Sequence, residues 1–178
     1  MLSADPFEVP EYLEILASNL PGLAVAVAGA DHPVALESAH RLSETSTIEP
    51  VLIGDAATIR SLADDVGWSL AGIRVVHESD EGKKAETAAS LAKSREVSII
   101  MKGHVHTDAL MRAALSRGAG LLTRRRPSHV FHITVPKREG VLLVTDAVVN
   151  VLPNARKMVD IVNNAVELAH ALGTATPH

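Results

Sequence analysis

The chain contains no cysteine among its 178 residues. This absence excludes disulfide bonds, a thiolate nucleophile and thiolate metal ligands, and it is typical of a cytoplasmic protein. Aromatic residues amount to only 2% of the sequence, so a surface that stacks the bases of single-stranded nucleic acid would be hard to build. The net charge of −4 provides no basic field for nucleic acid either. We therefore expect no nucleic-acid partner.

Long apolar runs and several familiar motifs are also missing. No apolar run approaches the roughly 20 residues of a membrane-spanning helix, and the N-terminus lacks the basic-then-apolar pattern of a signal peptide. The sequence has no GxGxxG, P-loop or GxSxG motif, which leaves nucleotide hydrolysis and serine hydrolysis unsupported. It also has no HExxH pattern, and His104 and His106 have no carboxylate at a familiar ligand spacing. We expect no membrane partner and no metal site.

The sequence does contain short apolar runs that alternate with amphipathic stretches. This alternation predicts an α/β fold, a three-layer α/β/α arrangement in which helices cover both faces of a mainly parallel sheet. We expect Asp31 and Ser79 to cap the helices that follow them. After a short helix that begins near Pro10, the expected order is strand 23–28, helix 32–43, strand 50–53, helix 56–65, strand 73–76, helix 80–95 and strand 98–101.

The pattern changes after Arg126. Apolar runs at 130–135 and 141–145 are separated by only five residues, too few for a crossover helix, so they predict an antiparallel hairpin. A helix is expected at about 155–172, ended by Gly173. A hairpin after parallel units indicates either an edge of the same sheet or the start of a second domain.

The stretch from Ser98 to Val135 carries the main functional signal. Its first strand leads through a glycine-containing turn into a helix with Thr107 as the expected N-cap. At such a helix start, free backbone N–H groups and the positive end of the helix dipole favour a bound anion. Lys102, His106 and Thr107 lie at the same turn, so we expect them to bind a phosphate group of the substrate.

Three further positions are candidates for the site. Arg112 lies in the second turn of the same helix, where it either flanks the site or points to solvent. Arg125, within a basic triplet, can clamp a phosphate bidentately or remain solvated. Asp146 ends a hairpin strand, where a carboxylate serves either as a turn residue or as a catalytic acid or base.

Five short motifs occur in a consistent order along the chain. They are AVAVAGA (24–30), EPVLIGD (49–55), MKGHVHTDALMR (101–112), RRPSHVF (125–131) and TDAVVNVLPN (145–154). Together they resemble the phosphate acetyltransferase/phosphate butyryltransferase family, and most closely its butyryltransferase branch. The resemblance extends from about residue 22 to residue 173.

The resemblance implies a reversible transfer of an acetyl or butyryl group between acyl phosphate and coenzyme A. The implied fold has two α/β/α domains and resembles isocitrate/isopropylmalate dehydrogenase, with residues 1–127 in the first domain and 128–178 beginning an incomplete second domain. The implied mechanism is direct attack of the coenzyme A thiolate on the acyl phosphate carbonyl. It implies no cofactor, coenzyme A being a substrate, and its partners are acyl phosphate, inorganic phosphate and coenzyme A.

The resemblance also assigns roles to individual residues. Arg112 matches the family arginine that contacts the phosphoryl group and stabilises developing charge, which makes it, with Asp146, a candidate catalytic residue. Thr107 and Ser128 match hydroxyl positions that line the substrate cleft. Arg124 replaces a usual glycine and Pro127 a usual aliphatic residue.

The chain is much shorter than members of this family, and this suggests a second interpretation. It can instead be a non-catalytic phosphate-binding, acyl-phosphate-binding or assembly module with the same fold. An incomplete second domain would expose the apolar faces of the runs at 130–135 and 141–144, and such a patch usually binds a partner. We therefore expect a homo-oligomer.

Overall fold

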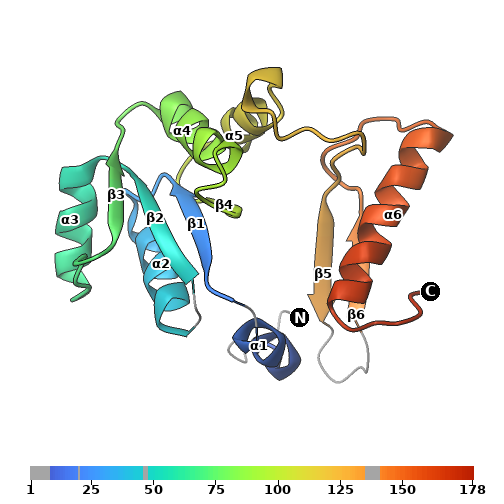
Figure 1. Cartoon of the computed structure of the whole chain (residues 1–178), viewed down its shortest axis with the longest axis horizontal. Helices are drawn as coiled ribbons and strands as arrows, with labels where there is room; N and C mark the ends of the chain where they lie inside the picture. The colour runs from blue at the N-terminus through green and yellow to red at the C-terminus, as the bar shows by residue number, and fades with distance from the viewer. Residues whose placement is uncertain (1–8, 20, 46–47, 135–140) are drawn as a thin grey trace, which may run out of the picture. The chain divides into compact units, whose positions relative to one another are not determined.

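The computed structural model describes residues 9–19, 21–45, 48–134 and 141–178. The chain divides into two compact units, Met1–Leu121 and Leu122–His178, and each is described here by itself (Figure 1). The expected domains, 1–127 and the beginning of a second at 128–178, stay a prediction.

The first unit contains a four-stranded sheet in which every pairing is parallel. Its strands are β1 (Leu23–Ala28), β2 (Ile48–Gly54), β3 (Arg74–His77) and β4 (Ile99–Lys102). Their order across the sheet is β3-β2-β1-β4. The chain thus moves outward from β1 to β3 and then returns to place β4 on the other side of β1 (Figure 1). This reversal leaves a crevice at the carboxyl ends of β1 and β4, the place where open α/β sheets generally bind ligands.

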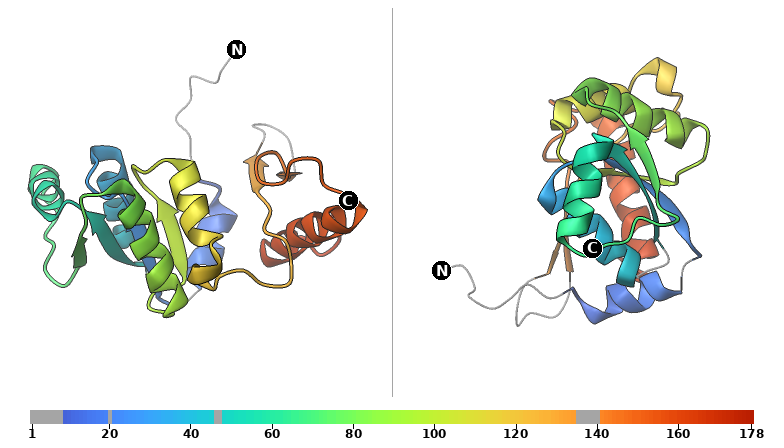
Figure 2. Two further views of the ribbon diagram at one scale, coloured as in Figure 1. Left: turned by 90° about the horizontal axis from the view of Figure 1, so that it is seen from above. Right: turned by 90° about the vertical axis from the view of Figure 1, so that its left-hand side faces the viewer.

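Helices cover both faces of this sheet, which confirms the predicted α/β/α layers (Figure 2). Buried residues of α2 and α3 pack on one face, whereas those of α4 pack on the other, where α5 lies against α4. The helices of the first unit are α1 (Glu11–Ser18), α2 (Pro33–Thr45), α3 (Ala56–Asp65), α4 (Glu81–Lys93) and α5 (Thr107–Ala114), with a 3₁₀ turn at Arg117–Ala119.

Alternation along β1 explains why the two faces differ. Val25 and Val27 face the core beneath α2 and α3, which includes the fully buried Leu36 and Leu52. The intervening alanines of β1 face α4, which itself presents small residues such as Ala88 to the sheet. Removing side chains such as Leu52 from water contributes about 2 kcal/mol each. The first unit therefore closes a continuous core on both faces.

The second unit is a hairpin with one helix. Strands β5 (Val130–Thr134) and β6 (Val141–Thr145) pair antiparallel, which confirms the hairpin, although the expected turn between them lies outside the described residues. The two strands form their own sheet, so the alternative of an added edge on the first sheet is wrong. Helix α6 (Ala155–Ala171) packs against β6.

One face of this hairpin is apolar and exposed. The cross-strand pairs Phe131–Val144 and Ile133–Leu142 put four apolar side chains on one face, each between 36% and 56% exposed. This confirms that the hairpin exposes apolar surface, as predicted from the sequence.

Three predicted helix caps are wrong by one residue. Asp80, not Ser79, caps α4 by accepting a hydrogen bond from the Lys83 N–H. His106, not Thr107, is the N-cap of α5, and Thr107 is the first residue of the helix. Helix α2 begins at Pro33, so Asp31 lies one residue before the cap position and its carboxylate serves another purpose.

Candidate functional site

Two glycine turns meet at the crevice between β1 and β4. Gly29 follows β1 with φ +81°, and Gly103 follows β4. A Cβ on Gly103 would lie 2.6 Å from the Gly29 carbonyl oxygen, so the backbones can approach this closely only because Gly103 lacks a side chain. The Gly103 N–H donates to Ala28 (2.9 Å) and the His104 N–H donates to Gly29 (2.9 Å). The turns are thereby held together, and the rings of His32 and His104 stack across them with centroids 4.2 Å apart.

A pocket of about 290 Å³ opens where β4 gives way to α5, and we call it the β4–α5 pocket. It brings together Lys102, His106 and Thr107, the three residues expected from the sequence to bind substrate there. Their binding roles stay predictions. The pocket is lined by Glu81, Lys102, Gly103, His104, Val105, His106 and Thr107.

The turn offers fewer free donors than the sequence suggests. The N–H groups of Gly103 and His104 are bonded to the turn after β1, and the His106 N–H donates to the Glu81 carboxylate. The Lys102 ammonium lies 3.2 Å from the Val105 carbonyl oxygen and donates to it. We expected the backbone N–H groups of this turn to be free to bind an anion, and this expectation is wrong for Gly103, His104 and His106. An anion in the pocket would therefore depend more on the side chains of Lys102, His104 and His106 than on the backbone N–H groups.

Glu81 is the residue of this pocket that sequence reasoning missed. It lies in the first turn of α4, and its Oε1 is 2.7 Å from His106 Nδ1 while also accepting from the His106 backbone N–H. The backbone N–H and the ring of His106, in that order, hold the pKa of Glu81 below its ordinary value. The sequence shows an acidic residue at a helix start, and its pairing with His106 depends on how α4 is placed over the sheet.

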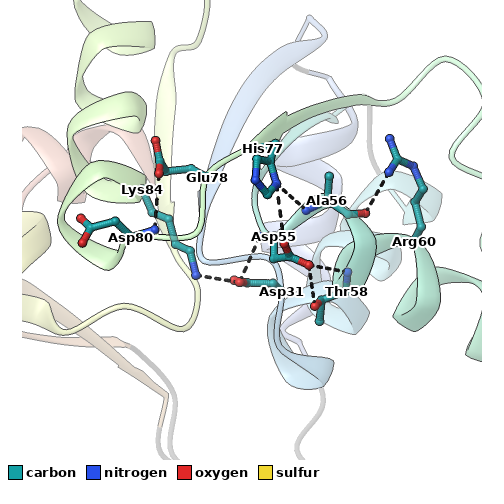
Figure 3. A network of polar contacts seen from close by, with 9 residues as sticks. All are labelled: Asp31, Asp55, Ala56, Thr58, Arg60, His77, Glu78, Asp80 and Lys84. Atoms are coloured by element: carbon teal, nitrogen blue, oxygen red, sulfur yellow. Dashed lines mark hydrogen bonds and ion pairs between the residues drawn. The ribbon is translucent and has the colours of Figure 1, made fainter.

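A second acid–base pair ties the ends of three elements together beside the crevice (Figure 3). Lys84 of α4 reaches Asp31, which follows β1, at 2.6 Å between Nζ and Oδ2. The same oxygen accepts the Asp55 N–H at the end of β2 (3.1 Å). Burial raises the pKa of Asp31, but the hydrogen bond from Lys84 and that from Asp55 outweigh it and the pKa lies below its ordinary value. Both side chains are nearly buried, so this pair fixes α4 against the sheet.

Arg112 does not line the β4–α5 pocket. Its guanidinium pairs with Asp108 one turn earlier at 3.0 Å and is 77% exposed. It lines a separate pocket of about 370 Å³ between α4 and α5, together with Glu86 and Lys93. The structure thus does not bring Arg112 together with Lys102 and His106, and its catalytic role stays a prediction.

In the second unit, helix α6 holds the basic loop. Three α6 residues at spacings of four and three present one polar stripe to the loop, Asp160, Asn164 and Glu167. Asp160 accepts the Arg126 N–H (3.2 Å), Asn164 Nδ2 donates to Ser128 Oγ (2.9 Å), and Glu167 pairs with Arg125 (2.6 Å). Glu167 raises the pKa of Arg125 through this contact. The clamp expected of Arg125 and the binding role of Ser128 stay predictions.

Asp146 builds the turn after β6. Its carboxylate accepts the N–H groups of Val148, Val149 and Asn150 (3.0–3.1 Å) and the side-chain amide of Asn150. Burial raises the pKa of Asp146, but the hydrogen bonds from Val149, Asn150 and Val148 outweigh it and lower the pKa to about 2. Asn150 also donates to the Pro127 carbonyl oxygen (2.9 Å), which links this turn to the basic loop. So low a pKa makes Asp146 a weak proton acceptor at neutral pH, and the geometry gives its predicted catalytic role no support.

Two broader searches cover only the residues that the structure describes. Among them, no three histidine, aspartate or glutamate side chains lie close enough together to hold a metal ion. No described helix is both long and apolar enough to cross a membrane.

Comparison with known proteins points to one family. Residues 78–178 match the family described as phosphate acetyl/butaryl transferase. The phosphate acetyltransferase of Rickettsia typhi is 40% identical over 144 residues, which cover 79% of this chain and 41% of that protein. The phosphate butyryltransferase of Clostridium acetobutylicum is 32% identical over 165 residues, which cover 93% of this chain and 54% of that protein. The chain spans about half the length of these relatives.

Solved structures agree on the fold. A branched-chain phosphotransacylase from Enterococcus faecalis superimposes with a TM-score of 0.67 at 25% identity, and the match covers 85% of this chain and 52% of that one. A phosphotransacetylase from Streptococcus pyogenes reaches a TM-score of 0.77 at 16% identity over 93% of this chain and 60% of that one, which shows a shared fold alone.

Proposed function

Because the chain belongs to the phosphate acetyl/butaryl transferase family, we propose that it takes part in the reversible transfer of an acetyl or butyryl group between acyl phosphate and coenzyme A. The observation that carries this proposal for the chain's own residues is the β4–α5 pocket. It lies at the ligand-binding edge of a parallel sheet and gathers Lys102, His106 and Thr107 in one place. These residues bind the phosphate end of the acyl phosphate.

The reaction needs few chemical groups from the protein. The thiolate sulfur of coenzyme A attacks the carbonyl carbon, a C–S bond forms, and the C–O bond to phosphate breaks with its electron pair leaving on the phosphate oxygen. Negative charge grows on the carbonyl oxygen and on the departing phosphate, so cations such as Lys102 lower the barrier by stabilising both. Coenzyme A is a substrate and no cofactor is required.

The direct test is an assay of the purified 178-residue chain with acetyl phosphate or butyryl phosphate and coenzyme A. Formation of the acyl-coenzyme A thioester and release of inorganic phosphate in equal amounts is the expected result. The control is the same assay with Lys102→Ala, which we expect to raise the KM for acyl phosphate. Absence of turnover with both acyl phosphates would contradict the proposal for this chain.

One observation favours a second candidate. Arg112, the predicted charge-stabilising residue, pairs with Asp108 and does not line the β4–α5 pocket, so we also propose a non-catalytic module that binds acyl phosphate or phosphate in that pocket. Such a module would bind inorganic phosphate in calorimetry, in a manner sensitive to Lys102→Ala, and would show no turnover. Turnover by the chain would remove this candidate.

We also propose that the protein acts in the cytoplasm as a homo-oligomer. The exposed apolar face of β5 and β6, with Phe131, Ile133 and Leu142, supports association, because such surface is stabilised when a partner covers it. Sedimentation at micromolar concentration should detect a species larger than a monomer. A monomer under these conditions would contradict this part of the proposal.

A further inference from the structure

Two imidazole rings stack beside the crevice between β1 and β4. His32 comes from the turn after β1 and His104 from the turn after β4, and their centroids lie 4.2 Å apart with an interplanar angle of 12°. The backbone of each residue is held in place. The His104 N–H donates to the Gly29 carbonyl oxygen (2.9 Å), and the His32 carbonyl oxygen accepts the Leu36 N–H in the first turn of α2 (3.0 Å). The stack therefore joins two fixed turns and restrains both rings.

The two rings differ in what they face. His104 lines the β4–α5 pocket with Lys102 and His106, whereas His32 lines only a neighbouring pocket of about 270 Å³ that His104 also reaches. His104 is exposed, and among the residues that the structure describes neither ring is hydrogen-bonded to the protein. The ring nitrogens of His104 are thus available to a ligand in the β4–α5 pocket, while His32 covers one face of that ring.

The surrounding charges favour one protonated form of the stack when an anion binds. A neutral imidazole offers one N–H, whereas an imidazolium offers two and carries a positive charge. Two protonated rings this close would repel each other, so the stack favours a single charge. His104 lies in the pocket with Lys102 and the Glu81 carboxylate. The pKa of Glu81 is lowered first by the hydrogen bonds from His106 and then by the charges of His106 and His104. A positive charge is therefore favoured on His104 over His32.

From this geometry we propose that His104, positioned by its stack on His32, binds the phosphate group of the substrate as an imidazolium and takes up a proton when the phosphate binds. The inference rests on the proposed binding of acyl phosphate in the β4–α5 pocket and adds two residues to that site. The proton comes from the solvent and returns to it when the phosphate leaves. The pocket should therefore bind tetrahedral anions more tightly as the pH falls through the range in which imidazole becomes protonated, about 5 to 8.

The charged and titratable groups around His104 come from several elements. They are His32 after β1, Glu81 on α4, Lys102 and His106 in the same turn, and Asp108 with its partner Arg112 on α5. His106 is the other imidazole of the pocket, and its ring contacts Glu81 at 2.7 Å. The experiment must therefore separate the contribution of His104 from that of His106.

The first experiment counts the protons that accompany anion binding. Sulfate is the probe, because it is a tetrahedral dianion that does not titrate in the range of imidazole. Calorimetry of the full chain in buffers of different ionisation enthalpy should show proton uptake at neutral pH. His104→Gln keeps a hydrogen-bond donor but no longer titrates. It should lower this uptake and weaken sulfate binding about tenfold at mildly acidic pH, as expected for loss of a charged hydrogen bond.

The effect should be small at mildly alkaline pH, where the ring is neutral before sulfate binds. His106→Gln should retain the share of proton uptake that His104→Gln loses. Undiminished proton uptake in His104→Gln, or a chain that binds no sulfate, would overturn the inference.

The second experiment tests the stack. His32→Phe keeps an aromatic ring against His104 and should preserve sulfate affinity and proton uptake. His32→Ala removes the stack and should weaken sulfate binding about fivefold. The matched control is His40→Gln, since His40 also stacks on a ring, that of Trp68 at 4.8 Å, but lies outside the pocket. It should change neither quantity. Equal losses in His32→Phe and His32→Ala would contradict the positioning role of the stack.

The outcomes separate this inference from the proposed function. In an active chain, His104→Gln should raise the KM for acyl phosphate more at acidic than at alkaline pH. The kcat should stay within about twofold, because substrate and transition state lose the same contact. Turnover with a KM that His104→Gln leaves unchanged would overturn the inference and leave the acyl transfer standing. Proton-linked sulfate binding without turnover would support the inference and contradict acyl transfer by this chain.

Discussion

The two units of the chain differ in how completely they bury their apolar residues. In the first unit the large side chains of Leu36, Leu52 and Ile59 are fully buried, and helices cover both faces of the sheet. In the second unit the buried apolar residues among those described are Ile161 and Ala169 of α6, while one face of the hairpin stays exposed. One helix covers only one face of the hairpin, so the second unit buries few apolar side chains. Burial of apolar surface therefore contributes far more to the stability of the first unit than to that of the second.

Their polar interactions differ in the same way. The Asp31–Lys84 pair of the first unit is about nine-tenths buried, whereas the Arg125–Glu167 pair of the second has side chains 41% and 64% exposed. A buried pair is costly to break because the remaining charge has no water around it, whereas an exposed pair is readily replaced by solvent. Matched substitutions in the two units test this contrast.

The largest effect is expected in the core of the first unit. Leu52→Ala should lower the free energy of unfolding by about 4 kcal/mol, because it removes a fully buried side chain and leaves a cavity. Leu142→Ala, at a site 56% exposed in the second unit, should change it by no more than about 0.5 kcal/mol. Urea unfolding measures both values. Equal losses would show that Leu142 is buried in solution, which would contradict the contrast between the two units.

The next effect concerns the buried ion pair. Asp31→Ala should cost about 3 kcal/mol because Lys84 is then left buried without its partner. Adding Lys84→Met should recover much of this loss. Glu167→Ala, which breaks the exposed pair in the second unit, should cost less than about 1 kcal/mol. A similar cost for the two single substitutions, measured by urea unfolding, would contradict the contrast in burial.

The third prediction compares two exposed arginines. Arg112→Ala should lower kcat/KM of an active preparation at least 10²-fold, about 2.7 kcal/mol, if the guanidinium stabilises charge in the transition state. Arg41→Ala is the matched control, since Arg41 also pairs with a carboxylate one turn earlier and its side chain is similarly exposed. Unchanged kinetics in Arg112→Ala would remove it from the mechanism, in accord with its place outside the β4–α5 pocket.

The smallest effect is a pH dependence in the second unit. The folded pKa of Asp146, about 2, lies below the ordinary value of 3.8, so its carboxylate contributes stability that is present above about pH 4 and lost as the pH falls towards 2. After allowance for solvent screening this amounts to about 1 kcal/mol. A ¹³C titration of the carboxyl group should give a midpoint near pH 2. A midpoint near 4 would show that the turn is not formed.

Much of the fold could be predicted from local sequence patterns. The continuous apolar run at 23–28 and the helix at 56–65 were predicted with the bounds that the structure gives to β1 and α3. The errors lie at helix starts: Ser79 was the predicted N-cap of α4, and Asp80 is the observed one. Neighbouring polar residues can each occupy a cap position, and the sequence does not show which of them has the backbone dihedral angles of a cap.

The candidate site could be predicted only in part. Lys102, His106 and Thr107 lie within six residues of one another, so a local pattern was enough to group them. Glu81 could not be found in this way, since its contact with His106 depends on α4 lying over the carboxyl end of β4. Arg112 was grouped with the pocket by sequence proximity, yet the rotation of α5 turns its side chain into another pocket.

The sequence by itself determined the alternation of strands and helices, the parallel sheet and the hairpin, because these depend on hydrophobic period and on the length of connections. Only the tertiary structure decided which distant side chains meet, Lys84 with Asp31 and Glu81 with His106. Glu81 and Lys84 are one turn apart on α4, yet Glu81 contacts the loop after β4 and Lys84 contacts the loop after β1. Both contacts are possible because α4 lies near the carboxyl ends of these two neighbouring strands. Such contacts follow from the packing of elements in space, which no local pattern encodes.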